Sequence, residues 1–242
     1  MAEPGRVVLR AVGVSRVFGT GSTEVHACSD IHLDVHAGEL LVVKGPSGAG
    51  KTTLLNMLGG LDRPSSGRVL LGELELSAMS EKELVDIRRK EIGYVFQSFG
   101  LIPILSAAEN VEIPLRLLDM DPRQRTERVR ELLALVGLEA HAEQRPYELS
   151  GGQQQRVGIA RALAGDPRVL IADEPTAQLD TRTGAAVMSL VHELVRDRGL
   201  TAVVATHDPA LISLADRMLE LRDGRIHDGW RGAAEETSQP VG

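Results

Sequence analysis

The chain has 242 residues, of which 43% are hydrophobic and 25% are charged, and its formal net charge is -7. A chain of this size can bury a substantial core, and its length favours one domain with an inserted subdomain. The acidic balance and the aromatic content of 2% argue against a basic groove or a stacking surface, so we expect no nucleic-acid partner.

Cysteine usage and hydropathy limit the cellular setting. The single cysteine, Cys28, excludes an internal disulfide and is typical of a reducing compartment, where we expect it to serve in packing. The first residues lack the apolar core of a secretory signal, and no apolar run approaches the length that crosses a bilayer. We therefore expect a soluble, cytoplasmic protein that reaches a membrane only through a partner.

Short apolar runs rich in Val, Ile and Leu predict strands, and helical patterns lie between several of them. The expected strands are Arg6–Leu9, Leu40–Val43, Arg68–Leu71, Ile92–Phe96, Val169–Ala172, Ala202–Ala205 and Met218–Leu221, with further antiparallel strands around His26–Val35. This alternation indicates an α/β layered domain with a mainly parallel central sheet and an antiparallel β part.

The middle of the chain, residues 98–164, holds helix signals and little strand signal. Asp121 and Pro122 are typical of an N-cap and a first helical position, and Gly137 ends a pattern with helical spacing, formed by Val129, Leu132, Leu133 and Val136. We expect a single domain over 1–230, with a core at about 1–97 and 165–230, a helical subdomain at about 98–164, and a disordered tail at 231–242.

A glycine-rich loop follows the apolar run that ends at Val43 and precedes a helical pattern. Its residues are Gly45, Pro46, Ser47, Gly48, Ala49, Gly50, Lys51 and Thr52, with Thr53 next. Glycines permit conformations that side chains forbid, so backbone N–H groups and the positive end of the helix converge on an anion. Lys51 is expected to reach the terminal phosphates and Thr52 to ligate magnesium, which predicts nucleoside triphosphate binding.

An acidic pair, Asp173 and Glu174, stands at the carboxyl end of an expected strand, where open α/β sheets bind ligands. Triphosphate hydrolysis needs a metal anchor and a group that orients or deprotonates water. Asp173 suits the first role and Glu174 the second. Without the glycine-rich loop, the pair would be interpreted as helix-capping acids before Pro175.

A second phosphate-type helix start lies far along the chain. Ser150 can cap a helix, and Gly151, Gly152 and Gln153 follow it at the start of an amphipathic pattern. The simpler interpretation is a plain capped helix. If both loops bind anions, they either share one nucleotide within a monomer or each complete a site with a second copy.

Together these motifs resemble the nucleotide-binding subunits of ATP-binding cassette (ABC) transporters, from about Val8 to Asp228. Gly45 to Thr52 is similar to the Walker A loop, Val169 to Glu174 to Walker B, and Leu149 to Gln153 to the signature sequence. Four single residues also match family motifs: Gln97 of the Q-loop, Asp180 of the D-loop, the switch histidine His207, and the adenine-stacking aromatic Phe18. Taken alone, a histidine at the position of His207 is more often structural or exposed, and Phe18 could equally be a core residue.

The resemblance implies a P-loop ATPase fold that uses ATP and Mg²⁺. It implies catalytic roles for Glu174, His207, Lys51 and Gln97, and magnesium ligation by Thr52, Gln97 and Asp173. The implied nucleotide contacts are Phe18, Gly45 to Thr53, Ser150 to Gln153, and Asp180. It also implies a head-to-tail dimer in which Ser150 of one copy closes over ATP held by the other. Ala177-Gln178 departs from the pair of small residues that usually precedes the D-loop.

Three further segments, 59–64, 97–103 and 109–114, resemble the MacB/LolD/FtsE-like branch. That likeness implies a separate transmembrane permease with a large extracytoplasmic domain, serving export, lipoprotein release or mechanotransmission, with this chain on the cytoplasmic face of the membrane. Phe99, Leu101 and Ile102 either line the groove for the permease or fill the helical subdomain.

Two other functions stay open at this point. One is a soluble ABC ATPase that acts on DNA or ribosomes, although the chain has a single cassette, no heptad run and an acidic balance. The other is an envelope regulator of FtsE type that signals without transporting anything. The sequence does not separate the regulator from a transporter.

Overall fold

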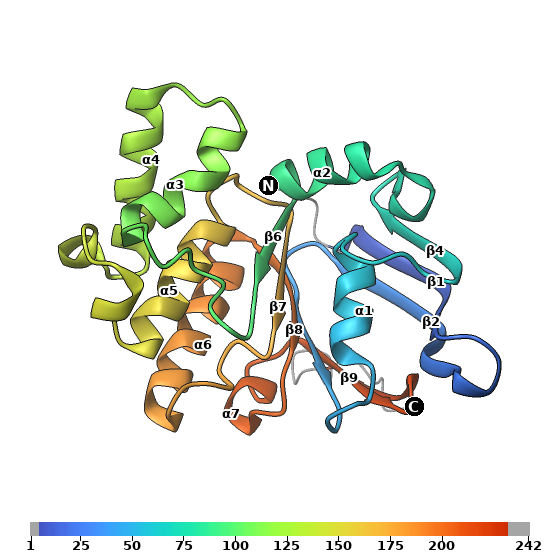
Figure 1. Ribbon diagram of the computed structural model, residues 1–242. Coiled ribbons are helices and arrows are strands. Elements are labelled where there is room, and N and C mark those ends of the chain that lie inside the picture. The colour runs from blue at the N-terminus through green and yellow to red at the C-terminus, as the bar shows by residue number, and fades with distance from the viewer. Residues whose placement is uncertain (1–4, 232–242) are drawn as a thin grey trace, which may run out of the picture.

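The computed structural model describes residues 5–231 and is organised around a six-stranded sheet of order β10-β9-β3-β8-β7-β6 (Figure 1). Its strands are β3 (Leu40–Lys44), β6 (Ile92–Val95), β7 (Val169–Asp173), β8 (Thr201–Ala205), β9 (Arg217–Arg222) and β10 (Arg225–Arg231). All neighbouring pairs are parallel except β9 and β10. The expected mainly parallel central sheet is therefore confirmed.

A second sheet of order β2-β1-β4-β5 is antiparallel throughout. It consists of β1 (Val7–Phe18), β2 (Val25–His36), β4 (Ser66–Leu71) and β5 (Leu74–Glu75). β1 runs well beyond the predicted Arg6–Leu9. The prediction stops short because most of this strand is covered on only one face and its register with β2 shifts between Ala11 and Val14. Such irregular, one-sided strands carry a weak apolar pattern.

Seven α-helices lie among residues 5–231: α1 (Lys51–Leu58), α2 (Glu81–Lys90), α3 (Ala107–Leu117), α4 (Pro122–Leu135), α5 (Gly151–Ala162), α6 (Thr181–Arg198) and α7 (Pro209–Ile212). Segment 98–164 contains α3, α4 and α5 and no strand. α4 begins as expected, with the Asp121 carboxylate accepting from the backbone N–H groups of Arg123 and Gln124 at 2.9 and 3.3 Å. Gly137 follows its end with φ +67°, a conformation that favours glycine.

The core lies on both faces of the parallel sheet. Leu40 and Val42 of β3 belong to the apolar cluster formed with α3, α4, α5 and α6, whereas Leu41 and Val43 belong to the cluster formed with α1 and the antiparallel sheet. Alternate residues of a strand face opposite sides, so a strand covered on both sides must be apolar throughout. This explains the unbroken hydrophobic runs of β3, β7 and β8, whose residues are almost all buried.

The parallel strands end together, and this edge carries the motifs. The glycine-rich loop follows β3, Glu174 follows β7, His207 follows β8 closely, and Gln97 follows β6 closely. Because adjacent strands are in register there, with Asp173 opposite Ala205 and Val43 opposite Ala205, the loops after them are brought side by side.

Two expectations concern the chain ends and membranes. Arg231, assigned to the disordered tail from sequence, is the last residue of β10, and the rest of that tail, 232–242, lies outside the described residues. Within residues 5–231, no helix combines the length and apolar character needed to cross a bilayer.

Candidate nucleotide site

The glycine-rich loop wraps the amino terminus of α1 and forms one wall of a cavity of about 720 Å³. Gly50 is the N-cap of α1 with φ +101°, and a Cβ there would collide with the backbone carbonyl oxygen of Ala27. A Cβ at Gly45 would collide in the same way with the carbonyl of Leu221. The loop therefore reaches its conformation because glycine stands at these two positions.

Cys28 lies directly beneath this loop. Its side chain is fully buried and its sulfur is 3.7 Å from the carbonyl oxygen of Gly50. Burial raises the pKa of the Cys28 thiol to about 11, so the thiol stays protonated at neutral pH. Its place in the structure is that of a packed, unreactive side chain.

Lys51 points back across the mouth of the loop. Its Nζ donates to the carbonyl oxygens of Gly45 at 2.8 Å and Pro46 at 3.2 Å. The same Nζ lies 3.3 Å from a carboxylate oxygen of Glu174, and only 9% of the Lys51 side chain is exposed. A largely buried ammonium group held by several oxygens has a fixed position, which makes it a ready partner for an anion in the cavity.

Glu174 contacts both Lys51 of the glycine-rich loop and His207, which follows β8. Its second carboxylate oxygen is 3.0 Å from His207 Nδ1, and its backbone N–H donates to the carbonyl of Ala205 at 2.9 Å. Its backbone has φ +44°, the left-handed region that non-glycine residues rarely occupy. Strain of this kind persists only where surrounding contacts impose it and is concentrated at functional sites.

Asp173, one residue earlier, is the carboxylate best placed for a cation. It is 8% exposed, and its buried Oδ1 has no hydrogen-bond partner among residues 5–231. Burial raises the pKa of this carboxyl group and Glu174 raises it further, while the hydroxyl of Thr52, which donates to the carboxylate, and Lys51 lower it. An orphaned buried oxygen beside a hydroxyl is a fitting donor set for a hard cation such as Mg²⁺.

Protein carboxylates and imidazoles alone do not build a metal site here. Nowhere among residues 5–231 do three or more His, Cys, Asp or Glu side chains gather in a way that could hold a metal ion. A cation bound at Asp173 therefore needs further oxygen ligands, for which Thr52 and Gln97, both on the cavity wall, are available.

The structure brings most of the sequence-predicted residues to this one cavity. Its lining includes the loop from Gly45 to Thr53 together with Gln97, Glu174 and His207. Val25, His26, Ala27 and Ala177 also line it. No motif marks the first three, because β2 carries them as part of an ordinary strand, whereas Ala177 belongs to the pair that precedes the D-loop residue Asp180.

The second glycine pair lies outside this cavity. Ser150 caps α5 through a capping box: its hydroxyl accepts from the backbone N–H of Gln153 at 3.3 Å, and its own N–H donates to the Gln153 side chain at 2.8 Å. A Cβ on Gly152 would collide with the side chain of Thr183 in α6, so α5 begins in close contact with the helix that Asp180 caps. Ser150 itself is exposed.

Phe18 also lies outside the cavity lining. Its ring is 41% exposed, and the guanidinium of Arg16 lies over it at 4.3 Å from the ring centroid. Its cross-strand partner Val25 does line the cavity, so the ring stands close to the mouth. The core role considered for Phe18 from sequence does not fit its exposure.

The sheet, the loop after β3 and the cavity at the carboxyl edge define a P-loop nucleotide-binding ATPase. The family model for ABC transporters matches residues 28–177. Over 219 residues the chain is 43% identical to the macrolide export ATP-binding/permease protein MacB of Salmonella typhimurium, covering 90% of this chain and 34% of MacB. Over 222 residues it is 42% identical to the lipoprotein-releasing system ATP-binding protein LolD of Chromohalobacter salexigens, covering 92% of this chain and 94% of LolD.

A solved structure is similar over nearly the whole chain. It is a dimer of the ATP-binding cassette MJ0796 in a post-hydrolysis state with ADP and phosphate, with a TM-score of 0.86, 40% identity, and coverage of 92% of this chain and 98% of that one. The chain belongs to the ABC transporter family, as an ATP-hydrolysing cassette of the MacB/LolD-like type. It spans only about a third of the length of MacB.

The orphaned carboxylate predicts opposite effects of Asp173→Asn on stability and on turnover. Because burial raises the pKa of Asp173, the folded chain holds this proton more tightly than the unfolded chain. The stabilising contribution of the protonated form is complete below the unfolded pKa and is lost as the pH rises through the folded pKa. At pH 7.5 the amide removes that penalty, so we expect the variant without ligand to melt at a higher temperature, while magnesium-dependent ATP hydrolysis is lost.

Thermal melts of both proteins at pH 4 and pH 7.5 measure this effect, and the gain in melting temperature should be larger at pH 7.5. Asp180→Asn is the matched control, because hydrogen bonds to Thr183 lower the pKa of that exposed carboxylate and its neutralisation should give no gain. A variant at Asp173 that melts lower than the parent at pH 7.5 contradicts the interpretation.

Proposed function

We propose that two copies of this chain sandwich ATP head to tail and that hydrolysis at the two shared sites drives a separate MacB/LolD-type permease. One observation carries the proposal. The cavity holds Lys51, Glu174 and His207 in one chain of contacts, whereas the exposed Ser150 loop lies outside it. The amino terminus of α5, which Ser150 caps, is a second place where an anion can bind. Because it contributes nothing to the cavity of its own chain, it is suited to complete the site of a partner copy.

In this proposal Glu174 orients and deprotonates the attacking water. Its carboxylate lies between Lys51 and His207, at 3.3 and 3.0 Å, at the edge where the terminal phosphate is expected. Lys51 and the loop N–H groups hold the phosphates and stabilise the charge that spreads over their oxygens during transfer. His207, whose side chain is 75% exposed, is free to turn toward the terminal phosphate.

Asp173, Thr52 and Gln97 are the residues proposed to hold magnesium. Within the described part of the chain, the buried Oδ1 of Asp173 has no hydrogen-bond partner, and the Thr52 hydroxyl interacts with the same carboxylate. A bound Mg²⁺ supplies positive charge that offsets the charge developing on the β- and γ-phosphate oxygens. Without a cation, burial disfavours the charged form of the Asp173 carboxyl group, and the interactions with Lys51 and Thr52 offset only part of this effect.

The partner half of each site is proposed to be Ser150 to Gln153, with Asp180 at the dimer contact. The capping box holds Ser150 at the first turn of α5, and Gly151 and Gly152 leave the backbone uncovered for an approaching phosphate. The dimeric state of the similar cassette MJ0796, bound to ADP and phosphate, supports this arrangement. Phe18, near the cavity mouth, is proposed to stack on the adenine ring.

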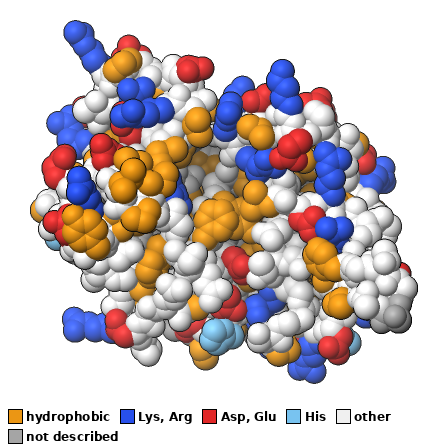
Figure 2. Space-filling view, viewed as in Figure 1, with side chains coloured by type: hydrophobic (Ala, Val, Ile, Leu, Met, Phe, Trp, Pro, Cys, Tyr) orange, Lys and Arg blue, Asp and Glu red, His pale blue; other side chains and the backbone are white. Residues whose placement is uncertain are grey.

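A groove of about 500 Å³ between α2, β6, α3 and α5 is the proposed seat of the permease. Hydrophobic side chains gather in a hollow between the two halves of the molecule (Figure 2), and Leu61, Phe96 and Leu117 line it while 44, 40 and 51% exposed. Exposed apolar surface in one hollow is typical of a protein interface. Segment 98–164, which forms one side, is the proposed helical subdomain.

The three residues suggested for this groove from sequence do not line it. Leu101 packs against the core cluster, and Ile102, although 41% exposed, is absent from the lining. The ring of Phe99 lies against Gly151 of α5, and its backbone has φ +58°. Their sequence neighbours Phe96 and Gly100 line the groove instead, so the alternative in which Phe99 and Leu101 fill the helical part fits their positions better.

The branch and cargo are inferred from relatives. MacB is named for macrolide export and LolD for lipoprotein release, and the identities of 43 and 42% do not favour one over the other. We propose that this chain works at the cytoplasmic face of the membrane with a permease that has a large extracytoplasmic domain, in export, lipoprotein release or mechanotransmission. The hypothesis of a DNA- or ribosome-acting ATPase gains no support from these relatives.

Replacing Glu174 with Gln tests the proposed chemistry. The amide keeps the shape of the side chain but cannot accept a proton, so turnover should fall by at least about 100-fold, the lower range of general base effects. ATP binding should persist, and the protein should elute as a dimer in magnesium ATP on size-exclusion chromatography. Elution as a monomer under saturating ATP, or turnover close to that of the parent, would refute the assignment.

The groove is tested by a double variant, Leu61→Glu and Leu117→Glu, because charges in an apolar contact are costly to bury. We expect the isolated chain to keep its basal ATPase rate while co-purification with its permease from detergent extract is lost. Leu74→Glu, at a residue of β5 that is 41% exposed outside the groove, is the matched control and should keep the permease. Equal loss in the control, or retention in the double variant, counts against this groove.

A further inference from the structure

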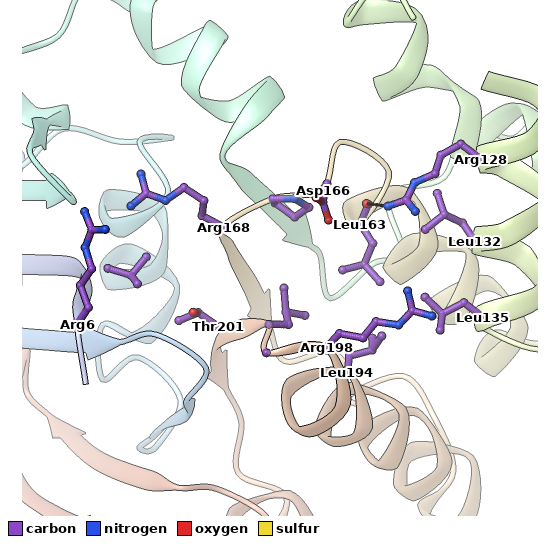
Figure 3. A pocket seen from close by; sticks show the side chains of 14 residues that line it. Arg6, Arg128, Leu132, Leu135, Leu163, Asp166, Arg168, Leu194, Arg198 and Thr201 are labelled. Carbon is purple, nitrogen blue, oxygen red and sulfur yellow. Dashed lines mark hydrogen bonds between the residues drawn. The ribbon is translucent and has the colours of Figure 1, made fainter. Parts of the chain in front are cut away.

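A second cavity, of about 500 Å³, opens at the edge of the sheet opposite the nucleotide site. Its lining includes Arg168, which directly precedes β7, and Thr201, the first residue of β8, whereas the nucleotide cavity lies beyond the last residues of these strands. We call it the arginine cavity, because Arg6, Arg128, Arg168 and Arg198 line it (Figure 3). No role assigned to the nucleotide site or the permease groove uses these arginines.

The arginines come from four separate parts of the chain. Arg6 precedes β1, Arg128 is on α4, Arg168 lies between α5 and β7, and Arg198 ends α6. Arg6 and Arg168 stand on one side of the cavity in Figure 3, and Arg128 and Arg198 on the other. Residues so distant in sequence are brought together only by the fold, at the junction of the helical segment 98–164 with the sheet.

The charge of this cavity is unusual for the chain. The whole sequence carries a formal charge of -7, yet the four arginines are accompanied in the lining by one acid, Asp166. Arg128 and Arg168 each have one long ion pair, 3.4 Å to Glu131 and 3.6 Å to Glu91. Among residues 5–231, no carboxylate lies within ion-pair distance of Arg6 or Arg198. Positive charges that line one cavity repel one another, and an anion placed between them offsets this repulsion.

The floor of the cavity is apolar. Val8, Leu132, Leu163 and Leu194 line it, and each is at most 7% exposed. Arg128 is tied to this floor through a hydrogen bond from its guanidinium to the carbonyl of Leu163 at 3.4 Å. A floor of this kind favours hydrocarbon over water, and the volume falls in the usual range for small-ligand sites, roughly 300 to 1,000 Å³.

We propose that the arginine cavity binds an anionic amphiphile, a molecule with a phosphate or carboxylate head and a short apolar body. The guanidinium groups match such heads bidentately, and the leucines accept the hydrocarbon. Because the site lies at the opposite sheet edge, the amphiphile and ATP bind at the same time. The occupant contacts both α4 and the core elements β1, α6 and β8, and thereby holds the helical segment against the sheet.

Isothermal titration calorimetry on the full chain tests this with hexyl phosphate, inorganic phosphate and hexanol, each with and without magnesium ATP. Hexyl phosphate should bind at least about tenfold more tightly than either fragment, since head and body are each expected to contribute at least about 1.4 kcal/mol, which corresponds to a tenfold change in affinity. Saturating ATP should not displace it. Equal affinity for inorganic phosphate or for hexanol would overturn the amphiphile assignment.

The matched variants are two double substitutions with the same change of charge. Arg6→Glu with Arg198→Glu places acids in the cavity at exposed positions, neither of which has an ion pair within the described chain, and should weaken hexyl phosphate binding at least about tenfold. Arg123→Glu with Arg130→Glu changes exposed residues of α4 outside the cavity and should leave affinity unchanged. ATP affinity should be the same in all three proteins, which verifies that the variants fold.

A sedimentation assay distinguishes the two sources of the ligand. Binding to phosphatidylglycerol vesicles but not phosphatidylcholine vesicles, lost with Arg6→Glu and Arg198→Glu, identifies a membrane lipid. Binding of hexyl phosphate without vesicle binding identifies a free small molecule. The proposal is overturned if the parent chain binds neither, or if the control pair loses binding as much as the cavity pair.

Discussion

The parallel register of three strands buried on both faces is the constraint on which the site depends. β8 pairs in parallel with β3 on one side and with β7 on the other, so the glycine-rich loop, Asp173 with Glu174, and His207 must leave the sheet at one edge. The apolar clusters on the two faces hold this register, because a slip of one residue would turn every core side chain to the wrong face. The chemistry is therefore positioned by packing far beneath it.

The same edge carries unfavourable features that packing offsets. Asp173 is buried with an oxygen that no group in the described residues 5–231 hydrogen-bonds, Glu174 is held at φ +44°, and the loop needs glycine where a Cβ would collide with Ala27 or Leu221. None of these improves the stability of the chain alone. Each is explained if ATP and a cation complete the site, since binding to the folded state recovers the stability that the empty site lacks.

The sequence predicts the parallel strands and the loop well, because full burial and phosphate binding leave local signatures. It misses most of β1, whose single buried face and register shift dilute the pattern, and it leaves Phe99 open between the proposed permease groove and the helical core, whereas Phe96 lines that groove. The arginine cavity leaves no local signal, since Arg6, Arg128, Arg168 and Arg198 meet only in three dimensions. Features that depend on contacts between segments distant in the sequence leave no local pattern from which they could be predicted.

The central claim is that each ATP is held by the Lys51 loop of one copy and the Ser150 loop of another. Copies carrying Lys51→Ala and copies carrying Ser150→Arg should each be inactive alone, yet their mixed dimer contains one site with both intact loops. ATP hydrolysis by the mixture, with mixed dimers verified by affinity tags on the two variants, tests this most directly. The account predicts turnover above the sum of the separate variants, and turnover no higher than that sum in verified mixed dimers would contradict it.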